Sequence, residues 1–125
     1  MNENELSKRI LDSCFKIHSL LGPGLLESVY EEVLTHELTK SGVKCERQKD
    51  IPVLYDSVQL DVGFRADIVV ENKVIIELKS IETVLPVHKK QLLTYLKLSH
   101  MKLGLLINFN VHSMKDGIVR IVNSL

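Results

Sequence analysis

The chain has 125 residues, of which 16 are basic, 16 are acidic and 45% are hydrophobic. This size and composition predict one domain, spanning residues 1–125, with a sizeable buried core, and they exclude a disordered or collagen-like chain. No apolar run approaches the ~18 residues needed to cross a membrane, and the polar start MNENELSKRI does not resemble a signal peptide. Cys14 and Cys45 lack metal-ligand spacing and favour reduced thiols, so we expect a cytoplasmic protein without a membrane partner.

The charges are unevenly distributed along the chain although they cancel overall. Residues 1–82 hold 15 acids and 10 bases, a balance of −5, whereas residues 83–125 hold one acid and six bases, a balance of +5. An acidic part beside a basic part suits a metal-dependent enzyme that acts on a polyanion, although such an asymmetry also arises by chance.

Hydrophobic spacing predicts a mixed α/β domain. Apolar residues recur at steps of three or four over 5–21 and 26–40, which indicates two amphipathic helices separated by Gly22-Pro23-Gly24. Strand-like segments then form an antiparallel meander, followed by a helix and two further strands. The expected strands of the meander cover residues 44–55, 58–62, 65–70 and 74–79, the helix covers 86–98, and the last strands cover 103–109 and 117–122.

The segment FRADIVVENKVIIELKS places Asp67 on one expected strand and Glu77 and Lys79 on the next. A two-residue turn would put Asp67 opposite an apolar residue and scatter the polar side chains. A three-residue loop over 71–73 pairs Val70 with Val74, sets Asp67 opposite Glu77, and sets Arg65 opposite Lys79. We expect this second register.

Two carboxylates at adjacent strand positions repel each other, and a divalent cation would remove the conflict. Oxygen ligands suit Mg²⁺ or Mn²⁺ better than Zn²⁺. Lys79, two residues further along the same face, would lie beside the metal, where it orients a water and offsets charge on a phosphate. The alternative reading of so short a pattern is a solvated Glu-Lys pair on the surface.

Two helical patterns accompany these acids. Glu27 and Tyr30 lie about one turn apart on the second helix, and Glu27 is a candidate third acid. Gln91 and Tyr95 lie at i and i+4 on the helix after the triplet and project from one side. Each also has a structural reading: a first-turn acid, aromatic core residues with wet hydroxyls, and a solvated glutamine.

The combined order of these segments resembles the PD-(D/E)XK nuclease superfamily, and most closely its GxxExxY family. The matching segments are Gly24-Leu-Leu-Glu27-Ser-Val-Tyr30, Arg65-Ala66-Asp67, Glu77-Leu78-Lys79 and Gln91-Leu-Leu-Thr-Tyr95. The resemblance implies a restriction-endonuclease-like fold, a central mixed β-sheet flanked by helices. It also implies Mg²⁺-dependent phosphodiester hydrolysis with Asp67, Glu77 and Glu27 as metal ligands and Lys79 as the catalytic lysine. Gln91 and Tyr95 match the QxxxY element of the RecB-like branch, which supports the site or contacts nucleic acid.

Three functional hypotheses follow. The first is a small nuclease that uses a metal-activated water on DNA or RNA, with Tyr30, His88, Lys89 and Lys90 as further supporting or nucleic-acid-binding residues. The second is a catalytically silent module that keeps the fold and binds nucleic acid or a protein partner. The third is a toxin or defence component, for which no residue is diagnostic. A homodimer would enlarge the substrate surface.

Overall fold

Two amphipathic helices begin the chain in this computed structural model, which describes residues 1–125. α1 (Glu3–Leu21) begins at Asn2, whose side chain accepts a hydrogen bond from the Glu5 backbone N–H, while the Glu5 carboxylate accepts one from the Asn2 N–H. The helix ends at Gly22, and α2 (Glu27–Lys40) follows the short loop. Both predicted helices are confirmed. No helix of the structure is long and apolar enough to cross a membrane.

The remaining elements form a five-stranded mixed sheet with one helix crossing it. The strands lie side by side in chain order, and only β3 and β4 run parallel, because a helix connects them. The elements are β1 (Cys45–Tyr55), β2 (Val58–Val70), β3 (Val74–Lys79), α3 (Pro86–Ser99), β4 (Leu103–Asn108), the 3₁₀ turn η1 (Met114–Gly117) and β5 (Ile118–Val122). The predicted α/β class, mixed sheet and meander are confirmed, although the two strands predicted over 58–70 are one continuous strand.

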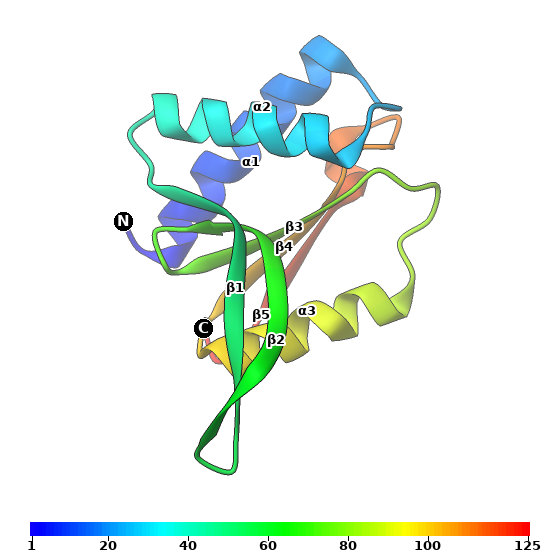
Figure 1. Cartoon of the computed structure of the whole chain (residues 1–125). Helices are drawn as coiled ribbons and strands as arrows, with labels where there is room; N and C mark the ends of the chain where they lie inside the picture. Colours follow the sequence, from blue (N-terminus) through cyan, green and yellow to red (C-terminus); the bar gives the residue numbers. More distant parts are fainter.

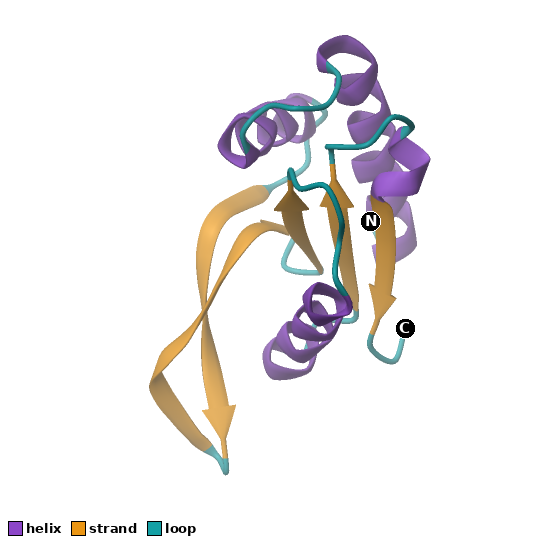
Figure 2. Ribbon diagram, turned by 90° about the vertical axis from the view of Figure 1, so that its right-hand side faces the viewer, coloured by secondary structure: helices purple, strands orange, loops and turns teal.

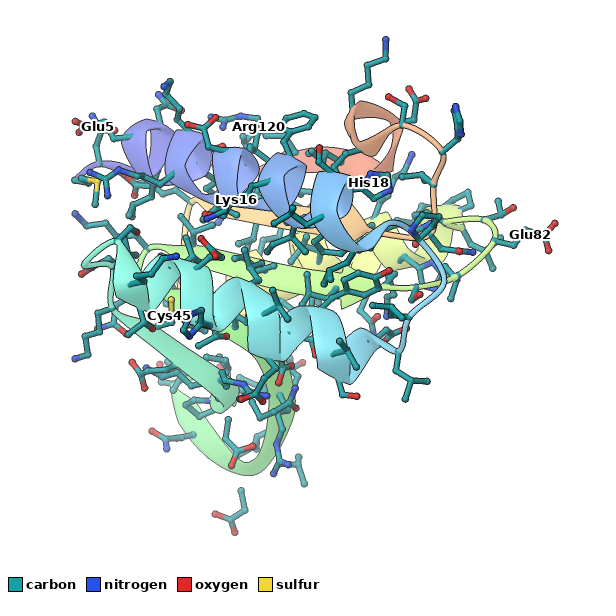
Figure 3. All side chains as sticks on the ribbon, turned by 90° about the horizontal axis from the view of Figure 1, so that it is seen from above. Glu5, Lys16, His18, Cys45, Glu82 and Arg120 are labelled. Atoms are coloured by element: carbon teal, nitrogen blue, oxygen red, sulfur yellow. The ribbon has the colours of Figure 1, made fainter.

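Helices cover both faces of the sheet, as Figures 1 and 2 show: α1 and α2 lie on one face and α3 on the other. Figure 3 looks down on α1 and α2 lying across the sheet. One apolar cluster joins α1 and α2 to Val74, Ile76 and Leu78, and a second joins Leu92 and other residues of α3 to Ile75. The alternation of β3 therefore assigns each of its side chains to one of two cores.

The predicted register between β2 and β3 is confirmed where the two strands pair. Val70 lies opposite Val74 and Ile68 opposite Ile76, with the Lys73 N–H bonded to the Val70 carbonyl across the loop. Pairing then ends, so the expected position of Arg65 opposite Lys79 is wrong. Beyond Ile68 the twisted β2 leaves β3 and stays paired with β1, where the Arg65 Nε donates to Asp50 at 2.9 Å.

The far end of the β1–β2 hairpin projects from the body of the molecule (Figures 1 and 2). We call residues 52–63 the hairpin arm. It exposes several large apolar side chains, with Tyr55 74% and Val62 71% accessible. The arm therefore adds surface without adding to either core.

Candidate active site

The central strand β3 carries Glu77 and Lys79 on the face toward α3. Glu77 lies within the sheet with only 9% of its surface exposed, whereas Lys79 lies half-buried at the end of the strand. Their neighbours Ile76 and Leu78 point to the opposite core. The buried position of Glu77 rules out the reading of this triplet as a solvated surface pair.

Asp67 reaches Glu77 at the point where β2 leaves β3. The Asp67 Oδ2 accepts a hydrogen bond from the Leu78 backbone N–H at 2.8 Å, so the carboxylate replaces a carbonyl of the missing strand partner. This contact draws Asp67 toward β3, and the structure brings the two predicted acids together.

Glu77 is an unusual carboxyl group because its Oε1 is buried without any hydrogen-bond partner. Burial raises the pKa of Glu77 to about 8, and the charge of Asp67 and a hydrogen bond shared with it contribute to the same direction, while Lys79 opposes the shift. A buried oxygen with nothing bound to it is costly, and a second acid beside it increases the cost. The pair therefore suits either a retained proton or a bound cation.

Lys79 lies two residues after Glu77 on the same face of β3, and it forms no ion pair or side-chain hydrogen bond. Its charge lowers the pKa of Glu77, which indicates proximity to that carboxyl group. The ammonium group is thus free to meet an anionic ligand.

Glu27, the predicted third acid, lies in the first turn of α2 with its side chain exposed. Its Oε2 accepts a hydrogen bond from the backbone N–H of Ser80 at 3.3 Å, and the Ser80 hydroxyl donates to the Leu25 carbonyl at 2.6 Å. Glu27 is therefore held at the end of β3, beside the residue that follows Lys79. No three His, Cys, Asp or Glu side chains are close enough to hold a metal ion, so Glu27 does not complete a cluster with Asp67 and Glu77.

Tyr30 is fully buried and stabilises the loop that leads to Glu27. Its hydroxyl donates to the Gly22 carbonyl at 2.6 Å and accepts from the Leu25 N–H at 3.2 Å, and its ring stacks on Phe109 at 4.3 Å. These contacts place the tyrosine in the core, where its hydroxyl bonds the loop between α1 and α2.

On α3, Tyr95 packs beside the acid pair and Gln91 lies exposed one turn earlier. The Tyr95 ring stacks on Phe64 with centroids 3.8 Å apart. Its pKa is raised, first by burial and then by the charges of Glu77 and Asp67, which indicates that Tyr95 lies near the pair. Of the predicted i, i+4 pair, Tyr95 therefore lies at the site and Gln91 lies in solvent.

The basic residues at the start of α3 have different positions. The His88 Nδ1 accepts a hydrogen bond from the Leu85 backbone N–H at 3.0 Å and so closes the first turn of the helix. Lys89 and Lys90 are exposed. His88 has a structural task at this point, whereas both lysines remain free to bind an anion.

Two further residues that the sequence analysis did not select hold the site together. Asn108 is buried at the end of β4, accepts from the Ile81 N–H at 3.1 Å and donates to the Ile81 carbonyl at 2.8 Å, which anchors the loop after β3. The only signal in the sequence is a polar residue that ends an apolar run. Gln48 of β1 donates to Asp67, and nothing in its sequence context predicts this.

An open hollow of about 550 Å³ lies beside Glu27 and Ser80 and extends to Asn110. A larger hollow, about 640 Å³, lies along the hairpin arm and its base and contains none of the residues selected from the sequence except Arg65. The first hollow adjoins the end of β3 through Ser80, and Glu27 is the site candidate that lines it.

Comparison with known families agrees with this geometry. A model of the PD-(D/E)XK nuclease superfamily matches residues 4–121, and the chain therefore belongs to this superfamily. Neither a curated protein nor a solved structure matches the chain. The five-stranded mixed sheet with three helices is consistent with the restriction-endonuclease-like fold, and the resemblance to the superfamily is confirmed.

Proposed function

We propose that the protein is a nuclease that hydrolyses phosphodiester bonds of DNA or RNA and depends on Mg²⁺ or Mn²⁺. The observation that carries this proposal is the buried Glu77 Oε1, which has no partner and lies beside Asp67 in a member of a nuclease superfamily. A catalytic metal would give this oxygen the partner that the protein alone does not provide.

The residues present fit a hard divalent cation. Asp67 and Glu77 provide carboxylate oxygens, and because the pKa of Glu77 is raised, a positive charge beside the pair would favour its ionised form. Glu27 would join them only through a movement away from the Ser80 N–H. When bound, such a cation lowers the pKa of a water molecule and polarises a phosphoryl oxygen.

The chain's own groups supply the other parts of the reaction. Lys79 places a positive charge beside the acids, where it stabilises negative charge that develops on the phosphate and orients the attacking water. Tyr95 lies near the acids on α3, and Lys89 and Lys90 on that helix attract the nucleic-acid backbone.

Cleavage assays test the proposal directly. Purified protein is incubated with single- and double-stranded DNA and RNA in Mg²⁺, Mn²⁺ or a chelator. We expect metal-dependent cleavage that falls by about a hundredfold or more in Glu77→Ala and in Lys79→Ala, since each removes a group at the reacting centre. Glu82→Ala is the control, because Glu82 points outward from the loop after β3 (Figure 3). The proposal fails if no substrate is cut or if cleavage survives both substitutions.

The second candidate function is that of a catalytically silent module that binds nucleic acid or a protein. The observation in its favour is that Glu27, Asp67 and Glu77 do not form a cluster of three carboxylates that could hold a metal ion. Titration with Mn²⁺ separates the two functions. An enzyme should bind the ion and lose that binding in Asp67→Asn, whereas a silent module should bind nucleic acid equally well with and without the metal.

We also propose that the chain belongs to the GxxExxY branch, because Gly24, Glu27 and Tyr30 lie together around the loop before α2. Both cysteines are free thiols, which supports a reducing compartment such as the cytoplasm.

A homodimer is supported by the exposed apolar side chains of the hairpin arm. Light scattering should then give twice the monomer mass for the wild type and the monomer mass for Val62→Glu.

A further inference from the structure

Gln48 has a left-handed backbone in the middle of a strand, with a φ of 48°. The pairing of β1 with β2 continues on both sides, with Arg47 opposite Ile68 and Lys49 opposite Ala66. Gln48 therefore lies directly opposite Asp67. A side chain destabilises this backbone conformation, which glycine adopts freely, so the glutamine needs an explanation other than backbone preference.

At Gln48 the β1–β2 hairpin rotates, so that side chains of one alternation set lie on one side of the sheet before this position and on the other side after it. Before it, Arg47 points to α2 and pairs with Glu31, whereas Ile51, four residues later on the same nominal face, belongs to the cluster under α3. On β2, both Val69 and Ala66 belong to that cluster although strict alternation would separate them. The rotation leaves the side chains of Gln48 and Asp67 at the pivot, outside both cores and able to meet.

A chain of polar contacts leads from α2 to Asp67 through this pivot. The Gln48 Nε2 donates to the Glu31 Oε1 at 2.5 Å and, over a longer 3.4 Å, to the Asp67 Oδ1. Glu31 is buried, and its Oε2 accepts from the Arg47 Nε at 3.1 Å. Because both partners of Gln48 are carboxylates, the amide nitrogen must be the atom that faces them.

Asp67 is thereby held at both of its oxygens. Its Oδ2 accepts from the Leu78 N–H and its Oδ1 from Gln48, which defines the plane of the carboxylate next to Glu77. We propose that Gln48 is a positioning residue, braced by Glu31, that orients the Asp67 carboxylate for metal binding; this inference rests on the proposed function of Asp67 as a metal ligand. Partners of this kind beyond the metal ligands typically change metal affinity by about 10–100-fold.

Gln48→Gly is the sharpest variant, because glycine removes the amide while it relieves the left-handed backbone. We expect Mn²⁺ affinity, measured by calorimetry, to fall about tenfold without a loss of thermal stability. Glu31→Gln should weaken Mn²⁺ binding in the same direction, and the double variant should lose no more than the larger single loss, since both residues act through one chain of contacts. Lys49→Gly is the matched control, because Lys49 bonds Glu46 and Asn72 instead.

A second readout needs no metal. The Leu78 amide is bonded to Asp67, so in Gln48→Gly its proton chemical shift should change and its hydrogen exchange should accelerate, while the neighbouring Ile76 amide stays unchanged. If the wild type binds Mn²⁺ and the variant binds it equally well, the inference is overturned. If the wild type binds no Mn²⁺, the proposed function and the metal role of Gln48 both fail, and an unchanged Leu78 amide would also exclude the Gln48–Asp67 contact.

Discussion

Glu77 and Asp67 destabilise the fold more than the other site residues, because two neighbouring carboxyl groups are placed together and one of them is buried. Glu77 lies between β4 and the point where β2 leaves β3, on the face toward α3, and its Oε1 has no partner. An alanine or a valine at this position would suit the packing of β3 better, as its apolar neighbours show. A buried acid that the core does not need indicates a function that requires it.

The raised pKa of Glu77 predicts how stability depends on pH. The folded protein retains this proton up to about pH 8, whereas the unfolded chain releases it near 4.5, so the unfolded state binds fewer protons within this window. The free energy of unfolding of the metal-free wild type should therefore fall, relative to Glu77→Gln, as the pH rises from 5 to 8. The difference in the free energy of unfolding between the variant and the wild type should grow by roughly 3–4 kcal/mol over this range.

Urea unfolding of both proteins at each pH measures this difference. Mg²⁺ should remove most of the disadvantage of the wild type at pH 8 and leave the variant unchanged, because only the wild type provides the second carboxylate. A constant difference between the two proteins over the whole range would refute the assignment of the shift to Glu77.

Tyr30 provides a second prediction at the residue scale. Tyr30→Phe keeps the stacking on Phe109 but leaves the Gly22 carbonyl and the Leu25 N–H without their partner. We expect a loss of about 1–2 kcal/mol in the free energy of unfolding, measured in urea. Tyr55→Phe is the control, since Tyr55 is exposed on the hairpin arm and should show no change.

At the scale of elements, the position of α3 decides whether Tyr95 reaches the acids. α3 packs closely on β4 because Gly104 has no side chain: a Cβ there would lie 2.9 Å from the Cγ and the Cδ1 of Leu92. Leu92 is buried in the cluster between α3 and the sheet. The helix and the site it carries therefore depend on one glycine in the neighbouring strand.

Gly104→Ala should push α3 from the sheet and lower the free energy of unfolding by about 1–3 kcal/mol. Leu92→Ala alone should cost about 2–5 kcal/mol through the cavity it leaves. The double variant should be more stable than the sum of the two losses predicts, because the new methyl group fills part of that cavity. Additive losses in urea would show that the two positions do not touch.

At the scale of the whole molecule, the fold separates charges of opposite sign. The acids of α2 and the lysines of α3 belong to helices on opposite faces of the sheet, and the end of β3 lies between them (Figure 1). A nucleic acid that approaches Glu77 would meet the lysines first, which keeps the backbone away from the acidic helix.

Binding of a DNA duplex should therefore depend on salt through α3. Replacing both Lys89 and Lys90 by alanine should reduce the slope of log K against log salt by about 2, since each phosphate contact contributes about 0.9. Fluorescence anisotropy over a range of salt concentrations measures the slope. Alanine at both Lys8 and Lys16 should leave the slope unchanged, because α1 lies on the face of the sheet opposite to α3 (Figure 2).

The sequence by itself determined the element types, the α/β class and the meeting of Asp67 with Glu77. These depend on local periodicity and on the length of one loop, and the positive φ values of Glu71 and Asn72 fit the three-residue connection from which the register was predicted. The pattern of β3 also showed which of its side chains would be buried together, because alternation is a local property of a strand.

Only the tertiary structure decided where β2 leaves β3, what holds Asp67 and where Glu27 lies. The left-handed Gln48 follows no residue preference, so no rule of alternation places Arg65 with Asp50 or Gln48 with Asp67. Glu27 accepts a hydrogen bond from the Ser80 N–H because the start of α2 lies beside the end of β3, a contact between residues 53 positions apart. Such arrangements result from the balance of twist and packing over the whole sheet, which a local pattern does not contain.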